Sequence, residues 1–212
     1  MELLRHALLL ALAVIAAGLA GSAQAQLPAP PPIEGNVYSV IYVEVLPTSR
    51  AEGLALLKRY REATRKEDGN LRCEVVQRID EPHQFAILGV WKDQAAFQAH
   101  GKGASSTEMR EKIAAIRNAP TDERVHAGLA VGPIQSQSVV GAVYVVTHVD
   151  VIPPRKDDGV AALKRLGDES RRGAGNLRFE VVQQTNRPNH LDRKSTRLNS
   201  SHIQKSRMPS SA

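Results

Sequence analysis

The chain repeats itself without a gap, and this repeat constrains its fold more than any other feature. Val43–Pro47 (VEVLP) returns 106 positions later as Val149–Pro153 (VDVIP), and Gly69–Gln77 (GNLRCEVVQ) returns as Gly175–Gln183 (GNLRFEVVQ). A period this long indicates duplication of a whole domain, because solenoid repeats are only about 20–50 residues long. We therefore expect two related domains: a first copy at residues 36–133 and a second copy at residues 141–191, joined by a linker at 134–140.

Periodicity within the first copy predicts its elements. Alternation of apolar and polar residues is typical of strands, and apolar residues at spacings of three and four are typical of helices. Ser49 is a candidate N-cap for the first helix and Gly69 a candidate stop. The expected order is β-α-β-β-α-β, an α+β ferredoxin-like domain with two helices on one face of an antiparallel sheet. The expected strands are 37–46, 71–79, 84–91 and 124–131, and the expected helical regions are 49–66 and 93–117.

The second copy follows this plan only in part. A strand at 142–152, a helix at about 155–172 and a strand at 176–185 are expected. Where the first copy has Phe85–Trp91 (FAILGVW), the second has Leu191–Arg197 (LDRKSTR), which lacks the alternation and the apolar surface of a third strand. We expect residues 192–212 to be disordered. This tail resembles translated sequencing-adapter sequence, and a genuine basic tail is the alternative.

The N-terminus predicts export. Residues 1–25 have Arg5 and His6, an apolar run and the small-residue site Ala23–Ala25 of a secretory signal peptide. An uncleaved membrane anchor is the alternative reading. Residues 26–35 form a proline-rich linker. We expect a periplasmic or secreted protein that has no membrane contact after cleavage and, with Cys73 as its single cysteine, no internal disulfide.

The basic charge does not indicate a nucleic-acid partner. The formal net charge is +6, but Arg193, Lys194, Arg197, Lys205 and Arg207 all lie in the tail, which has no acidic residue after Asp192. Without them the globular part is nearly neutral. A nearly neutral domain lacks the basic surface that attracts phosphates, so we expect no nucleic acid to bind.

Titratable and aromatic residues recur on one face of the first strand of each copy. Because side chains alternate along a strand, Tyr38, Tyr42 and Glu44 share one face, and Val37, Ile41, Val43 and Val45 share the other, which suits packing beneath the helices. The equivalent residues of the second copy are Tyr144, His148 and Asp150. Each of these residues either belongs to a functional site or has a structural role. In the structural role its side chain packs or is exposed to solvent, and its polar group is hydrogen-bonded.

Short motifs in the first copy resemble those of the antibiotic biosynthesis monooxygenase (ABM) family of dimeric α/β barrels. They are Gly69–Leu71, Glu81–Pro82, Val90–Asp93 (VWKD), Ala95–Phe97 and His100. The resemblance implies that two sheets pack face to face, in a homodimer or in a pseudo-dimer within one chain. It also implies oxygenation of a quinol or polycyclic phenol by dioxygen, with no metal, flavin or other cofactor. The haem-degrading relatives are disfavoured, since His100 and Arg110 stand near their tryptophan and axial histidine positions.

The resemblance and the strand faces together indicate which residues form the candidate site. Catalysis requires a dry pocket, a base and donors that hold a phenolate. The alternatives are a module that binds a small aromatic ligand without turnover and a purely structural partner domain. Position 89 is often acidic in this family and is glycine here. The candidate catalytic residues are His100, Tyr42 and Glu44, and the candidate substrate-binding residues are Tyr38, Trp91, Tyr144, His148 and Asp150, with no metal ligand expected.

Overall fold

A computed structural model describes residues 32–135 and 141–198. Both copies belong to one compact unit that starts at Pro31. The predicted signal peptide, most of the proline-rich linker and residues 199–212 lie outside the described residues. Within the described part of the chain, no helix is long and apolar enough to cross a membrane.

The first copy has the expected β-α-β-β-α-β order, with its second helical region divided in two. Gly103 separates α3 from α4, and Asp93 caps α3 by accepting a hydrogen bond from the backbone N–H of Ala96. Ser49 precedes the first long helix, but its side chain makes no capping hydrogen bond. The elements are β1 (Val37–Glu44), the 3-10 turn η1 (Pro47–Ser49), α2 (Arg50–Thr64), β2 (Asn70–Gln77), β3 (Gln84–Trp91), α3 (Gln94–Lys102), α4 (Ala104–Ile116) and β4 (Asp122–Ala130).

The second copy continues further than the sequence predicts. Its elements are β5 (Ala142–Asp150), η2 (Pro153–Arg155), α5 (Lys156–Arg171), β6 (Asn176–Gln184) and β7 (His190–Leu198). The prediction that no third strand forms is therefore wrong, and so is the prediction of disorder for residues 192–198. β7 pairs with β5 on one side and β6 on the other, so its backbone groups are satisfied by the sheet although its side chains are polar. Tertiary pairing overrides the weak local strand pattern.

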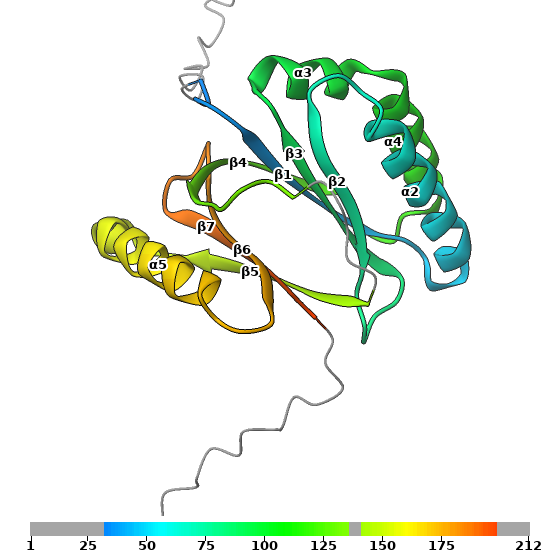
Figure 1. The fold of residues 1–212 in the computed structure, drawn as a ribbon. Helices are drawn as coiled ribbons and strands as arrows, with labels where there is room; N and C mark the ends of the chain where they lie inside the picture. Colours follow the sequence, from blue (N-terminus) through cyan, green and yellow to red (C-terminus); the bar gives the residue numbers. More distant parts are fainter. Residues whose placement is uncertain (1–31, 136–140, 199–212) are drawn as a thin grey trace, which may run out of the picture. The chain divides into compact units, whose positions relative to one another are not determined.

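One antiparallel sheet of seven strands joins the two copies, in the order β2-β3-β1-β4-β6-β7-β5. The first four strands have the ferredoxin-like order, and β4 pairs with β6 to connect the copies. As Figure 1 shows, α2, α3 and α4 cover the strands of the first copy, and α5 covers those of the second. The sheet faces without helices, here called the inner faces, contact each other through side chains of β2, β5 and β6.

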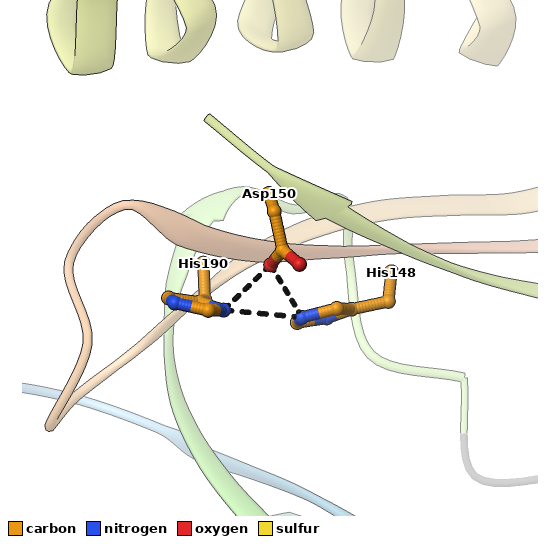
Figure 2. Close-up of side chains that lie close together, drawn as sticks. All are labelled: His148, Asp150 and His190. Carbon is orange, nitrogen blue, oxygen red and sulfur yellow. Dashed lines mark hydrogen bonds and ion pairs between the residues drawn. The ribbon is translucent and has the colours of Figure 1, made fainter. Parts of the chain in front are cut away.

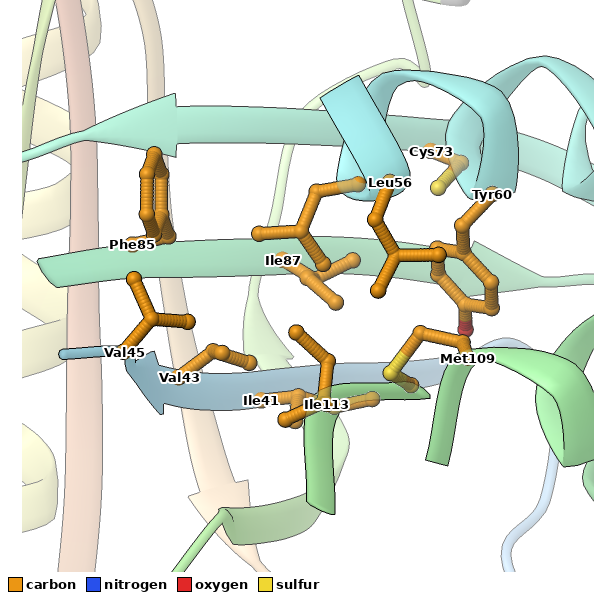
Figure 3. Close-up of a cluster of buried hydrophobic side chains, with 11 residues drawn as sticks. Ile41, Val43, Val45, Leu56, Tyr60, Cys73, Phe85, Ile87, Met109 and Ile113 are labelled. Atoms are coloured by element: carbon orange, nitrogen blue, oxygen red, sulfur yellow. The ribbon is translucent and has the colours of Figure 1, made fainter. Parts of the chain in front are cut away.

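The main core lies between α2, α4 and the first-copy strands. Ile41, Val43 and Val45 pack there, as the alternation of β1 predicts (Figure 3). Burying an aliphatic side chain of this size contributes about 1.5–3 kcal/mol. A second core under α5 contains Leu163, Phe179 and Leu191. Each copy therefore buries its own helix-covered face, which leaves the inner faces to pack against each other.

Gly69 and Gly175 hold the same turn in the two copies. Both have a left-handed backbone, with φ of 79° and 75°, and each lies immediately before the second strand of its copy. Only glycine adopts this conformation without a steric cost. The helix α2 ends earlier, at Thr64 with Arg65 as its C-cap, so the prediction that Gly69 stops the helix is wrong and the glycine instead shapes the turn into β2.

Candidate functional sites

Two reciprocal ion pairs fill the centre between the inner faces. Arg72 Nη2 donates to both carboxylate oxygens of Glu180 at 2.7 and 2.8 Å, and Arg178 Nη2 donates to Glu74 Oε2 at 2.7 Å. The four residues are equivalent in pairs under the sequence repeat, and all are buried. Charges this deep are tolerated when they are paired. This network joins β2 of the first copy to β6 of the second.

Tyr38 and Tyr144 lie on the inner faces, as predicted, beside this network. Tyr38 is fully buried, packs against Val90 and Val182, and has its pKa raised by burial. The Tyr144 hydroxyl donates to Glu74 at 2.9 Å. Tyr38 therefore packs in the interior, whereas Tyr144 also reaches the pocket described next.

A pocket of about 650 Å³ lies between β2 and β5, the two end strands of the sheet. Tyr42 and Tyr144 line it together with apolar residues such as Val76, Ala86 and Val146. Burial raises the pKa of Tyr42 to about 12, with the nearby charge of Asp192 adding to the shift. Tyr42 is thus a neutral hydrogen-bond donor at ordinary pH. The pocket has the size and the mixed lining of a small-molecule site.

Glu44 does not join that pocket. Its carboxylate accepts a hydrogen bond from Asn118 at 2.6 Å and lies 3.7 Å from His83. Glu44 is partly exposed at the end of β1. In the structure Glu44 therefore anchors Asn118, just after α4, at the protein surface.

His100 lies on the opposite side of the sheet, beneath the helices, and is 7% exposed. Its Nδ1 is 2.6 Å from Glu67 Oε2, and its Nε2 is 2.8 Å from the Tyr60 hydroxyl. Ser106 Oγ lies 2.9 Å from the same Nε2. The imidazole is not on the surface, since α3 turns His100 inward against α2 and α4. A carboxylate, an imidazole and a phenol in series form an acid–base relay.

Trp91 belongs to the His100 group. Its ring stacks on the imidazole with the centroids 4.3 Å apart, and it is 2% exposed. β3 pairs Trp91 with Val37, and its ring packs against Ala96 on the helix-covered face. Gly89 leaves room for this packing, since a Cβ there would clash with Ser39 Oγ and lie 3.2 Å from Trp91 Nε1. His100 and Trp91 thus lie on the opposite face of the sheet from Tyr38, Tyr42 and Tyr144.

His148 and Asp150 form a third group, with His190 as an unpredicted member (Figure 2). Asp150 Oδ1 lies 2.7 Å from His148 Nε2 and 2.5 Å from His190 Nδ1. On its other side, His148 Nδ1 is 2.6 Å from Asp192 Oδ1. Burial alone would raise the pKa of Asp192, but hydrogen bonds with His126 and His148 lower it to about 2. Asp192 therefore stays ionised.

Sequence reasoning missed Glu67, Tyr60 and His190. Tyr60 has helical spacing typical of a core residue, and Glu67 lies in a turn, so neither carries a local sign of chemistry. The H-x-D pattern of His148 and Asp150 places both on one strand face, but His190 begins a strand that is not consecutive with theirs, so no local pattern marks it. The antiparallel register then sets His190 directly opposite Asp150.

Comparison with known proteins indicates the family to which the chain is similar. Residues 36–112 match the family described as ABM, antibiotic biosynthesis monooxygenase. The chain is 30% identical over 81 residues to “Putative monooxygenase YcnE” of Bacillus subtilis (strain 168), covering 38% of this chain and 85% of that protein. His100, Trp91, Tyr60 and Glu67 all lie within the matched residues.

Two crystal structures show that the fold likeness extends beyond the first copy. The “putative monooxygenase” of Fusobacterium nucleatum superposes with a TM-score of 0.70 at 16% identity, covering 77% of this chain and 76% of that one. The “putative monooxygenase” of Lactobacillus acidophilus NCFM gives 0.65 at 13% identity, covering 78% of each chain. At such identities the likeness concerns the fold alone. The fold, the family match and the curated relative agree that this chain belongs to the antibiotic biosynthesis monooxygenase family.

Proposed function

We propose that the protein is a cofactor-independent monooxygenase that acts on a quinol or polycyclic phenol, with His100 as the base. The observation that carries the proposal is the bond between His100 Nε2 and a phenolic hydroxyl, that of Tyr60, at 2.8 Å. A substrate phenol that replaced this hydroxyl would meet the same nitrogen at the same distance. Proton transfer needs such hydrogen-bond reach.

The surroundings of His100 support this role. With Nδ1 donating to the Glu67 carboxylate, Nε2 carries the lone pair that can accept a proton. Burial raises the pKa of Tyr60, so its hydroxyl stays protonated and donates to His100. The stacked Trp91 ring offers an apolar aromatic wall to a flat substrate.

The chemistry requires no further redox partner. A deprotonated quinol is electron-rich enough to reduce dioxygen directly. One oxygen atom enters the ring and the other leaves as water, so that a hydroquinone and dioxygen give a hydroxyquinone and water. The protein then supplies only proton transfer, a site that excludes water and donors that hold the anion.

Oxygen uptake by the full chain with a panel of quinols, in the absence of added metal or flavin, tests the proposal. We expect His100→Gln to lower the rate by about 10²–10⁴-fold, the usual contribution of a general base. Tyr144→Phe alters the pocket on the inner face and so distinguishes the two sites: with His100 as the base, this variant should leave the rate within a few-fold. Circular dichroism verifies that both variants fold.

The same experiment addresses the alternative of a non-catalytic binding module. The pocket lined by Tyr42 and Tyr144 lies on the face opposite His100, which is the observation that favours this alternative. Quinol binding without oxygen uptake, weakened by Tyr144→Phe and unaffected by His100→Gln, would refute the oxygenase and support the module.

We also propose that the protein acts outside the cytoplasm, in the periplasm or the medium. The support is the signal-like sequence of residues 1–25. N-terminal sequencing of the protein from a fractionated culture should begin at Gln26. A chain found intact in the cytoplasm, beginning at Met1, would contradict this.

A further inference from the structure

We propose that His148, Asp150 and His190 bind a divalent transition-metal ion at the end of the β5–β7 ladder (Figure 2). This site is separate from the oxygenase centre proposed above and does not depend on it. Among the residues that the structure describes, these three form the group of histidine, cysteine and carboxylate ligand atoms that lie within 4.8 Å of one another.

The strand register builds the site. His148 and Asp150 are two positions apart on β5 and therefore share a face, and β7 begins with His190 directly opposite Asp150. His148 Nε2 and His190 Nδ1 are 3.3 Å apart. Ligand atoms around a tetrahedral zinc ion lie roughly 3.3–3.5 Å from one another, given bond lengths of about 2.0–2.2 Å. A small outward movement of the Asp150 carboxylate is enough to admit an ion.

Asp192 supplies the support that metal-binding histidines usually have. Its carboxylate accepts the Nδ1–H of His148 at 2.6 Å, which directs Nε2 to Asp150 and His190. A carboxylate behind a ligating histidine fixes the tautomer and makes the ligand more basic. Asp192 is itself fully buried and lies 3.2 Å from His126, so this support is rigid.

The donor set indicates the class of metal. Two imidazoles and one carboxylate suit zinc, nickel, copper, cobalt or ferrous iron, whereas magnesium and calcium prefer oxygen ligands throughout. Three protein ligands leave at least one coordination position for water. Asp150 is mostly exposed, at 61% of its side chain, so an ion can enter from solvent.

The first copy provides a natural comparison. The positions equivalent to His148, Asp150 and His190 are Tyr42, Glu44 and Gln84, which together offer no imidazole. The site therefore belongs to the second copy and does not follow from the repeated fold.

Calorimetric titration of the full chain with Zn²⁺, after removal of metal by a chelator, tests the proposal. We expect one tight site. His190→Gln, which introduces the residue found at the equivalent position of the first copy, should weaken its affinity for Zn²⁺ by at least a hundredfold. Asp192→Asn should weaken it by about 10–100-fold without changing the stoichiometry. His83→Ala, which removes a half-buried histidine in the equivalent turn of the first copy, is the control and should leave the affinity unchanged.

Cu²⁺ provides a second readout that does not depend on a variant. Its electron paramagnetic resonance spectrum in the unaltered chain should show coupling to two imidazole nitrogens. Zinc binding that His190→Gln leaves unchanged, or binding no tighter than that of free histidine, would overturn the proposal. So would a copper spectrum with a single nitrogen ligand.

Discussion

Glu180→Leu removes one half of the buried ion network that joins the two copies. Its carboxylate accepts two hydrogen bonds from Arg72, and the two side chains are 2% and 1% exposed. The substitution leaves the Arg72 guanidinium buried with only a 3.5 Å contact to Glu74. Removing one partner of a buried ion pair costs about 3–5 kcal/mol. For a chain of this size we therefore expect the melting temperature to fall by roughly 6–20 °C.

The matched double variant separates charge burial from simple loss of packing. Arg72→Met/Glu180→Leu removes both charges and replaces them with apolar side chains, and it should recover most of the lost stability. Urea unfolding followed by circular dichroism gives the free energies of unfolding. A loss below about 1 kcal/mol in Glu180→Leu, or a double variant as unstable as the single one, would refute the idea that the copies are held together through this network.

Three further outcomes follow from the same structure. Lys194 lies in β7 where the first copy has Leu88, and burial lowers its pKa to about 8. Since the unfolded lysine titrates near 10.4, only the unfolded state holds this proton between about pH 8 and 10.4, so the contribution of Lys194 to stability should rise with pH across that window by up to about 3 kcal/mol. In urea melts the stability of the unaltered chain relative to Lys194→Leu should therefore rise by this amount, and a difference that does not change with pH would contradict the reasoning. Burial raises the pKa of Cys73 to about 12, so its thiol should resist alkylation at pH 8 until the chain is unfolded; rapid labelling of the native protein would contradict this. The fragment 36–133 should be a homodimer in light scattering, since its inner face lacks the second copy, whereas a stable monomer would show that this face does not need a partner.

Much of the fold could be predicted because it is determined by local patterns. The alternation of Val37–Glu44 set the faces of β1, and the turn glycines Gly69 and Gly175 marked where helices give way to strands. β7 could not be predicted in this way. Asp192 and Lys194 have weak strand preference, and their strand forms because β5 and β6 supply backbone partners on both sides.

The long repeat, the element order of the first copy and the kinds of residue available for chemistry could be read from the sequence, because they follow from residue types and their spacing along the chain. Which of these residues meet depends on the fold. His100 and Tyr42 were candidates for one site, yet the helices cover the first and the inner face carries the second. His148 meets His190 because an antiparallel register joins positions 42 residues apart. Such contacts depend on strand pairing and helix packing, which a local pattern does not specify.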